Sequence, residues 1–553
     1  MQFQQKRILT WFDRTANIWA ALLVLIFLFT GVLTLRYYGL TWDESLGNLF
    51  FGERYFQFFS SFNPKFLDFD MNLAIHSQHP LNLYLSPFRN TPNEFPPLAD
   101  TLSAATMYLF SYTLGWLNPI DGFHLFTILL AAVFLWVTYR FFAPRIGKFT
   151  ALLAIIFLGT FPRFWADMHF NVKDVPETLF FGLTLMTYWS WYEKPRWTKA
   201  LLAGVLMGCA LAVKANAIFI PVLLLLAVLP WNFRKAAWLD LIRHFARTFW
   251  QYGIMMVSAL GAYILSWPYL YADPYHRLKQ YWGYIFSQGG RSGGFAWNID
   301  PIRQVVTTLP EFFLAAVLVG LVVVVLSAVK SGKVGWRILI LWLIFPILRA
   351  SLPGMVNFDG IRHFLEFVPA AAVIAAIGFT FVLHWLEEHL HLRREVVGGV
   401  GVGLVLINLV WIYTAYFPNL HLYYNSLVGG LSGARDGFLG ADATDYWGTT
   451  YRAGMEWINQ NAPENSSVQA LIAPWIVDIS APVILRPDIE VIPQGTLSDY
   501  SILREKRTPT YLMFITRGVA QNSNTNYCVT HEKPVYQIFV DGVPVLMIFQ
   551  FGG

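Results

Sequence analysis

Apolar runs of about twenty residues recur along most of this chain, and they constrain its fold more than any other feature. The runs extend from Ala16 to Phe417, with short polar breaks between them. A hydrocarbon core about 30 Å thick needs roughly 20 apolar residues per crossing helix. The chain is also 56% hydrophobic and only 13% charged, which is too apolar for a soluble protein of 553 residues. We therefore predict an all-α polytopic membrane protein.

Basic residues in the breaks predict its orientation, because Lys and Arg in short loops mark the cytoplasmic side. Such breaks occur near residues 6–14, 140–148, 194–199, 234–247, 330–337 and 393–394. Placing all of them inside predicts about eleven crossing helices, near residues 16–36, 122–142, 149–166, 176–191, 197–214, 217–231, 248–267, 304–329, 338–352, 364–386 and 397–417. The N-terminus would then be cytoplasmic and the C-terminus extracytoplasmic.

Two apolar segments need a special interpretation in this scheme. The stretch from Leu98 to Leu117 is apolar enough to cross, but a crossing there would place every later basic loop outside. We therefore predict a re-entrant or surface helix within a large first outer loop, residues 37–121. Residues 200–231 must form a hairpin of two short helices, with Lys214-Ala215-Asn216 as its turn.

The segment after Phe417 differs in character, since polar residues are scattered among short apolar runs. We predict two parts, a transmembrane domain over residues 1–417 and an extracytoplasmic α/β domain over residues 418–553. Tyr451 to Asn461 is predicted as a helix, and strands are predicted at 468–473, 510–515 and 535–551, the last turning at Asp541-Gly542. This domain could select an acceptor or cap a cavity.

Several functional classes are disfavoured by the sequence. The net charge is only +5 and is spread over short loops, which argues against a nucleic-acid surface. The two cysteines, Cys209 and Cys528, provide neither a disulfide framework nor a CxxC motif. No HExxH, P-loop, GxSxG or dinucleotide fingerprint stands in the context that it requires.

Two adjacent carboxylates, Asp43 and Glu44, stand where the first helix leaves the membrane. A low-dielectric boundary raises carboxyl pKa values toward those of a useful general base. Thr41 and Glu44 also have the spacing of a capping box, in front of an apolar and aromatic stretch from Ser45 to Phe59 that suits a helix lying on the membrane. The sequence around this site fits both interpretations.

A second acidic site, Asp174, precedes Pro176 at the predicted start of the fourth helix. Capping alone could explain it, because an acidic group near a helix N-terminus gains a few tenths to about 1 kcal/mol. However, Asp174 and Asp43 are predicted on the same side of the membrane at similar depth. This coincidence favours a shared functional site.

Basic residues on the predicted outer side are few, and three positions stand out: Lys214, Arg291 within a glycine-rich segment, and Arg362-His363. A charge near hydrocarbon is expensive and needs a partner, which a lipid phosphate would supply. Snorkelling toward headgroups is the alternative for Lys214 and Arg362, and a flexible linker is the alternative for the glycines around Arg291. Aromatic residues crowd the loop after residue 262, where they could stack on sugars, although most suit interfacial anchors.

Four short motifs, in order along the predicted outer face, resemble those of the membrane-embedded GT-C glycosyltransferases. The similarity is to the dolichyl-phosphate-mannose protein mannosyltransferases and the lipid A aminoarabinose transferases. Both belong to the superfamily that resembles glycosyltransferase family 39. The motifs are Thr41-Trp42-Asp43-Glu44, Glu94-Phe95-Pro96-Pro97-Leu98, Lys173-Asp174-Val175-Pro176 and Arg362-His363-Phe364-Leu365 with Pro369. Phe95 replaces the histidine of the family's His-Pro-Pro-Leu segment, and His79-Pro80 is only a distant stand-in, so a role for that histidine does not carry over.

This resemblance implies a glycosyltransferase that moves a sugar from a polyprenyl- or dolichyl-phosphate donor to a protein or glycolipid hydroxyl, with inversion. It implies Asp43 as the base, Glu44 and Asp174 shaping the site, and Arg362, His363, Lys214 and Arg291 binding the donor phosphate. No cofactor is required, although such oxygen ligands suit Mg or Mn. We expect a prokaryotic plasma-membrane protein. The rival interpretation is a lipid-linked sugar flippase or transporter, which would more often show repeated halves and polar sites at the midplane.

Overall fold

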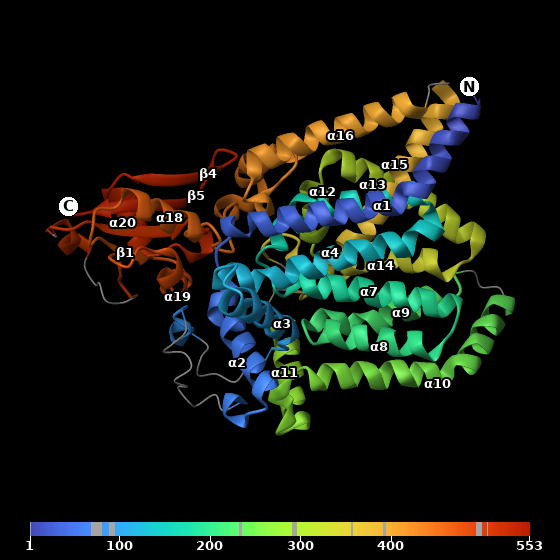
Figure 1. Cartoon of the computed structure of the whole chain (residues 1–553), viewed down its shortest axis with the longest axis horizontal. Helices are drawn as coiled ribbons and strands as arrows, with labels where there is room; N and C mark the ends of the chain where they lie inside the picture. The colour runs from blue at the N-terminus through green and yellow to red at the C-terminus, as the bar shows by residue number, and fades with distance from the viewer. Residues whose placement is uncertain are drawn as a thin grey trace.

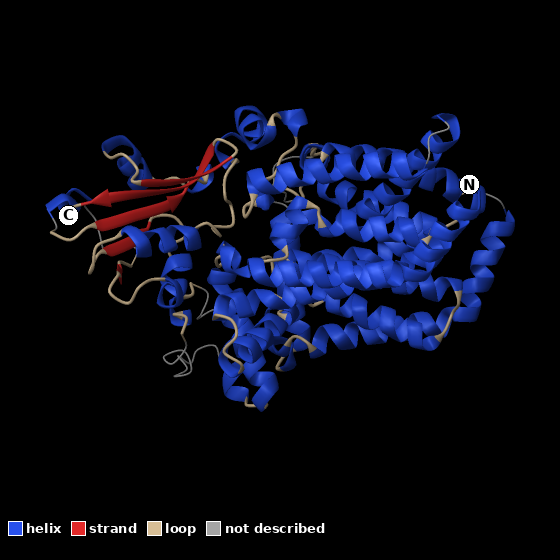
Figure 2. Cartoon of the chain, turned by 45° about the horizontal axis from the view of Figure 1, so that its top comes forward, coloured by secondary structure: helices blue, strands red, loops and turns tan. Residues whose placement is uncertain are grey.

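The computed structural model describes residues 2–67, 80–87, 95–231, 235–289, 296–355, 358–390, 394–493, 500–505 and 507–553. Long helices form one part of it, and a smaller domain holds the β-sheet (Figure 2). The sheet domain lies beyond one end of the helices, whereas the N-terminus lies at the other end (Figure 1). This arrangement separates the two ends of the helical part into a sheet-domain end and an N-terminal end.

Helices occur at all eleven predicted positions, although their bounds differ. They are α1 (Gln2–Thr34), α4 (Pro119–Ile146), α5 (Lys148–Gly159), α7 (Asp174–Glu193), α8 (Trp197–Leu211), α9 (Ile220–Val228), α10 (Lys235–Leu265), α13 (Glu311–Ser331), α14 (Val334–Ser351), α15 (Val368–Leu390) and α16 (Arg394–Tyr416). Within the described residues, six segments are long and apolar enough to cross a membrane: 15–37, 119–146, 237–265, 311–331, 334–351 and 362–389. The predicted helical membrane fold is confirmed, and the count of eleven crossings stays a prediction.

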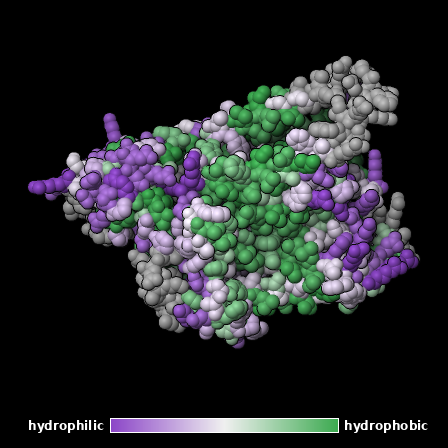
Figure 3. Space-filling model, in the orientation of Figure 1, coloured by the Kyte–Doolittle hydropathy of each residue, from purple (hydrophilic) through white to green (hydrophobic). Residues whose placement is uncertain are grey.

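The surface of the helical part is apolar, as a lipid-facing surface must be. Phe29, Val257, Val322 and Ile407 are each more than half exposed. Hydrophobic side chains form a broad area across the helices, between the hydrophilic sheet domain and a hydrophilic region at the opposite end (Figure 3). Soluble proteins rarely expose so large a continuous apolar surface to water, so the structure supports burial of this area in a bilayer.

Two predicted helices are interrupted at prolines. The helix predicted at 304–329 is two helices, α12 (Asp300–Thr308) and α13, because Pro310 disfavours helical geometry at Leu309. The helix predicted at 149–166 is likewise divided, into α5 and α6 (Pro162–Asp167), with extended Phe161 between them. The sequence prediction missed these breaks because the apolar pattern continues through them.

The predicted hairpin at residues 200–231 is present, and a short 3-10 helix (Ala215–Phe219) joins α8 to α9. Residues 98–117 form α3 (Leu98–Met107) and a π-helical turn (Tyr108–Thr113), which is not among the six long apolar segments of the described chain. The stretch from Ser45 to Phe59 is helical as predicted, within a π-helical turn (Glu44–Asn48) and α2 (Leu49–Ser61). Both α2 and α3 lie at the sheet-domain end (Figure 1).

The sheet domain contains five strands in the order β2-β1-β3-β5-β4. They are β1 (Ser467–Ala470), β2 (Glu490–Val491), β3 (Thr510–Ile515), β4 (Tyr536–Val540) and β5 (Val543–Phe551). The first three are parallel, and β5 pairs antiparallel with β3 and β4. Asp541 and Gly542 both have positive φ, as a tight hairpin turn requires. The α/β character predicted for this segment is therefore present.

Helices accompany the sheet, and α18 (Tyr451–Asn461) has the bounds predicted from the sequence. The other two are α19 (Trp475–Ile484) and α20 (Ser523–His531). The remaining α-helices in the described residues are α11 (Pro274–Gly289) and α17 (Gly430–Ala434). One buried ion pair ties α18 to the helical part, since Arg452 Nη1 donates to Asp121 Oδ1 at 2.6 Å and to the Tyr38 carbonyl at 3.1 Å. The sheet domain is thereby attached to the start of α4 and to the segment that follows α1.

Candidate functional site

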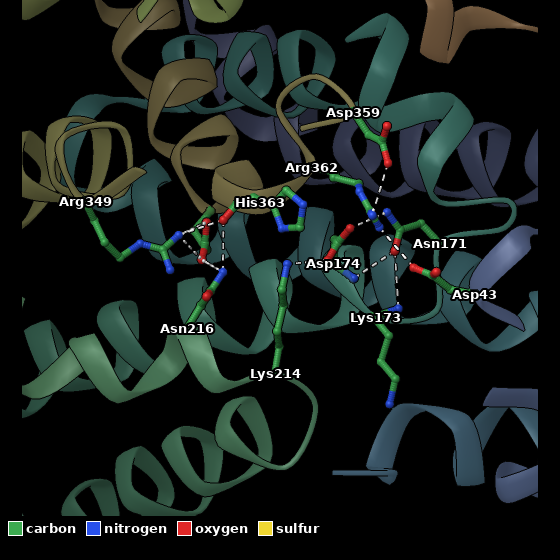
Figure 4. Close-up of polar contacts among 11 residues, drawn as sticks. Asp43, Asn171, Lys173, Asp174, Lys214, Asn216, Arg349, Asp359, Arg362 and His363 are labelled. Atoms are coloured by element: carbon green, nitrogen blue, oxygen red, sulfur yellow. Dashed lines mark hydrogen bonds and ion pairs between the residues drawn. The ribbon is translucent and has the colours of Figure 1, made fainter. Parts of the chain in front are cut away.

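Charged side chains converge near the sheet-domain end of α7 and at the start of the α15 region, and Arg362 is at their centre. Arg362 Nη1 donates to Asp43 Oδ2 at 3.0 Å, and its Nη2 lies 3.1 Å from Asp359 Oδ2. Figure 4 shows the guanidinium between these two carboxylates. Because Arg362 is only 10% exposed and paired twice, it does not snorkel to the headgroups.

Asp43 and Glu44 are neighbours in sequence but have different surroundings. The Asp43 side chain is 42% exposed and has the Arg362 guanidinium beside it. Glu44 is buried, accepts hydrogen bonds from the Thr41 backbone and hydroxyl, and lies 3.0 Å from His124. Glu44 thus makes the capping contacts that the sequence allowed, whereas Asp43 remains accessible to another molecule.

Asp174, at the first turn of α7, forms a second charge pair with Lys214 from the hairpin turn. Lys214 Nζ donates to Asp174 Oδ1 at 2.6 Å, and Asn171 Nδ2 donates to Oδ2 at 2.9 Å. Burial raises the pKa of Asp174, but Lys214 and Arg362 outweigh it, so the pKa lies below its ordinary value. Asp174 therefore holds a negative charge near Arg362, and Lys214 is paired instead of snorkelling.

The Pro96-Pro97 segment contacts the second acidic motif through Lys173. Lys173 Nζ donates to the Pro96 carbonyl at 2.8 Å and to Asp100 Oδ2 at 2.5 Å. Burial raises the pKa of Asp100 to about 6, although Lys173 opposes this. The hairpin turn also meets this region, because the Leu98 amide donates to the Ala212 carbonyl at 3.0 Å. The second and third predicted motifs thus contact each other and the hairpin, and the first and fourth motifs meet through Arg362.

A third charge pair involves Arg349, which lies on the other side of His363 from Arg362 (Figure 4). Arg349 Nη2 donates to Glu366 Oε1 at 3.1 Å and to the His363 carbonyl at 2.8 Å. Asn216 Nδ2 donates to the same carbonyl at 3.0 Å. The His363 Nε2 atom is buried and has no hydrogen-bond partner within the described chain. These contacts hold the backbone from which Arg362 projects.

Sequence reasoning missed two residues of this site, Asp359 and Arg517. Arg517 Nη2 donates to Asp359 Oδ1 at 2.9 Å, so one carboxylate joins two guanidinium groups. Asp359 has a φ of 58°, and a Cβ on the following Gly360 would lie 2.5 Å from Arg163 Nη1. The three-residue spacing from Asp359 to Arg362 could have suggested the first pair. No sequence signal links residue 517 to residue 359.

Some predicted residues stay untested or have a different role. Arg291, Glu94 and His79 lie outside the described residues. Several aromatic residues after 262 are neither exposed platforms nor headgroup anchors, because they pack into the interior: Tyr263, Trp267, Tyr269 and Tyr281. Within the described ranges, no group of three or more His, Cys, Asp or Glu side chains could hold a metal ion.

The arrangement provides a half-exposed carboxylate beside a guanidinium, with further cations on the same side. Such a site can accept a proton from a hydroxyl and neutralise a phosphate within a short distance. The acidic and basic groups gather at the sheet-domain end of the helices. The helical membrane fold and this charged site agree with the GT-C class that the sequence motifs resemble.

Comparisons with known proteins agree with this class. Residues 95–267 match the family model described as dolichyl-phosphate-mannose-protein mannosyltransferase. The matched segment contains Pro96, Lys173, Asp174 and Lys214. None of the curated proteins matches the chain by sequence.

Two solved structures are similar to this chain, and the first has a similar overall fold. The chain is similar to ArnT from Cupriavidus metallidurans bound to undecaprenyl phosphate, with 13% identity, a TM-score of 0.50, and 96% of this chain and 98% of that chain covered. It is also similar to the Archaeoglobus fulgidus oligosaccharyltransferase, with 11% identity, a TM-score of 0.47, and 97% and 74% of the two chains covered. The family match over residues 95–267 and the ArnT-like fold agree with the resemblance that the sequence motifs predict.

Proposed function

We propose that this protein transfers a sugar from a polyprenyl- or dolichyl-phosphate donor to a hydroxyl group of a protein or glycolipid acceptor. The observation that carries the proposal is the Asp43–Arg362 pair, which places an accessible carboxylate 3.0 Å from a guanidinium. A carboxylate can serve as a general base, and a guanidinium matches the geometry of phosphate oxygens.

The proposed reaction is a single displacement at the anomeric carbon. The acceptor oxygen forms a bond to that carbon, while the bond between the carbon and the phosphate oxygen breaks. Asp43 takes the acceptor proton, and Arg362 stabilises the negative charge that develops on the departing lipid phosphate. Because the acceptor attacks opposite the leaving group, the anomeric configuration inverts.

The other predicted residues have supporting roles in the proposal. Asp174 and Glu44 shape the site, and Lys214, His363 and Arg291 complete the phosphate side of it. Lys214 is the clearest of these, because its ammonium is already held 2.6 Å from Asp174. The reaction requires no cofactor, so transfer should continue in a chelator such as EDTA.

The comparisons support the donor class and the setting. The family model names a dolichyl-phosphate-mannose transferase, and the ArnT structure contains undecaprenyl phosphate. The helical part is suited to hold a long lipid chain in the bilayer while its phosphate reaches Arg362. We place the site on the extracytoplasmic face of a prokaryotic plasma membrane, with the N-terminus inside, because the basic loops predict that orientation.

Radiolabelled sugar transfer in detergent tests the proposal. Polyprenyl-phosphate mannose and polyprenyl-phosphate aminoarabinose serve as donors for the wild type, Asp43→Asn and Asp174→Asn. We expect Asp43→Asn to lower the transfer rate by about 10²- to 10⁴-fold, which is the usual contribution of a general base. Asp240→Asn is the matched control, since Asp240 is an exposed residue on α10. Full activity of folded Asp43→Asn would exclude Asp43 as the base.

A lipid-linked sugar flippase is the rival function, since it too needs a phosphate-binding arginine within many helices. The concentration of charges toward one end of the helices favours the enzyme, because transporters usually bind near the midplane. Reconstitution in liposomes distinguishes the two. Movement of the lipid-linked sugar between leaflets without any transfer would establish the flippase.

A further inference from the structure

The residue before the proposed base is held by the sheet domain. The Trp42 amide donates to the Trp447 carbonyl at 2.8 Å, and the Trp42 ring packs edge-on against Trp475 at 5.4 Å between centroids. The Arg517 guanidinium lies over the same ring, 5.2 Å from its centroid. Three separate segments of the sheet domain therefore fix the position of Trp42, and with it the backbone of Asp43.

Arg517 also begins a chain of charges that ends at Asp43. Asp359 accepts from Arg517 at 2.9 Å and lies 3.1 Å from Arg362, which in turn donates to Asp43 at 3.0 Å. Arg517, Asp359 and Arg362 are each at most 16% exposed, so solvent screens these contacts little. Arg517 further donates to the Tyr446 carbonyl at 3.0 Å, which anchors it within its own domain.

The charge balance of this chain depends on Arg517. Two carboxylates and two guanidinium groups sum to zero, and loss of Arg517 would leave a net charge of −1. Arg362 would then be the only guanidinium paired with Asp359. The region is poorly solvated, so the excess negative charge would strongly affect nearby groups. The electrostatic potential around Arg362 would then be more negative, so an incoming phosphate would be attracted less strongly.

We propose that Arg517 is a positioning residue that sets the orientation and charge of the Asp43–Arg362 pair, so that the sheet domain is part of the donor-phosphate site. This inference rests on the proposed function, in which Arg362 binds the lipid phosphate. It assigns the C-terminal domain a role inside the site, where the sequence suggested only acceptor selection or a cap. Arg517 itself does not touch the reacting atoms.

The first test measures the affinity for sugar-free polyprenyl phosphate in detergent, which does not depend on transfer. Arg517→Ala should bind it about tenfold more weakly, the change expected when one charge-assisted contact is lost. Arg504→Ala is the matched control, because Arg504 pairs with Glu532 on the surface of the same domain. Equal affinity of folded Arg517→Ala and Arg504→Ala would overturn the proposal.

A second variant separates charge from general stability. Adding Asp359→Asn to Arg517→Ala restores the neutral balance, so affinity should recover toward the wild-type value. A merely structural role for Arg517 predicts no recovery, and that result would also overturn the inference. Arg517→Lys should recover only part of the affinity, since one ammonium cannot contact Asp359 and Tyr446 as the fork of arginine does.

Hydrogen–deuterium exchange of residues 41–48 tests this inference without depending on the proposed function. If the wild type binds no polyprenyl phosphate, the proposed function fails. Faster exchange in Arg517→Ala than in Arg504→Ala would still support the positioning of Trp42 and Asp43. Unchanged exchange would contradict it.

Discussion

Single residues in this protein differ from their sequence neighbours mainly through burial. Asp43 is half-exposed and paired with Arg362, whereas Glu44 is buried against Thr41 and His124. Asp167 is the extreme case, because it is 2% exposed and its Oδ1 atom has no hydrogen-bond partner within the described chain. Burial and the nearby Asp174 raise its pKa to about 8, although Arg163 and Arg362 oppose the shift.

This raised pKa predicts a pH-dependent stability. An unfolded Asp has a pKa of about 3.9, so the folded state holds one additional proton between that value and about pH 8. Stability should therefore decrease as pH rises through this window, by up to about 1.4 kcal/mol per pH unit. Asp167→Asn removes this contribution. The melting temperature of Asp167→Asn minus that of wild type should therefore be larger at pH 8 than at pH 5.

Thermal unfolding in detergent at several pH values measures this difference. Asp240→Asn is again the control, because an exposed carboxylate should not change the pH dependence. An equal pH dependence in wild type and Asp167→Asn would show that Asp167 is ionised in both folded and unfolded states.

At the scale of elements, glycines allow close helix crossings. A Cβ on Gly320 of α13 would lie 1.9 Å from the Ile374 carbonyl oxygen, and one on Gly378 of α15 would lie 2.1 Å from the Ala316 carbonyl oxygen. Both contacts are with backbone atoms, which cannot rotate away. Small residues at such a crossing let the helix backbones touch, which is a main source of attraction between helices in lipid.

Gly320→Ala should therefore separate α13 from α15 and lower the free energy of unfolding by about 1–3 kcal/mol, as overpacked substitutions usually do. Gly261→Ala on α10 is the control, because a Cβ there meets nothing within 4 Å. The melting temperatures of the two variants in the same detergent measure the effect. A decrease of the same size in both variants would argue against the close crossing.

At the scale of the whole molecule, the buried Arg452–Asp121 pair joins the two domains. Both side chains are 8% exposed, and Asp121 lies at the start of α4. Arg452→Ala leaves Asp121 without its cation, and breaking such a pair typically costs about 3–5 kcal/mol. We expect a lower melting temperature, faster hydrogen exchange over residues 445–461, and reduced sugar transfer. Arg504→Ala should change none of these quantities, and an unchanged exchange rate in Arg452→Ala would contradict the proposed docking.

Much of the fold was predictable, because membrane helices and strands leave local patterns. Apolar runs and basic breaks located the helices, and turn residues located the hairpin at Asp541-Gly542. The breaks before Pro162 and Pro310 were missed, since hydrophobicity alone does not register them. Short motifs likewise identified Asp43, Asp174 and Arg362 as candidates, and the scarcity of basic residues on the predicted outer side identified Lys214.

The sequence by itself determined that the chain enters a membrane, roughly where its helices lie, and which charged residues are too costly there to be incidental. Only the tertiary structure decided which charges meet. Arg517 lies 158 residues from Asp359, and Asp43 lies 319 residues from Arg362, so no local pattern could pair them. Long-range packing of the sheet domain on the helical part brings these groups together. Buried charges are stable only when a partner lies within contact distance, so both members of each pair must be in place.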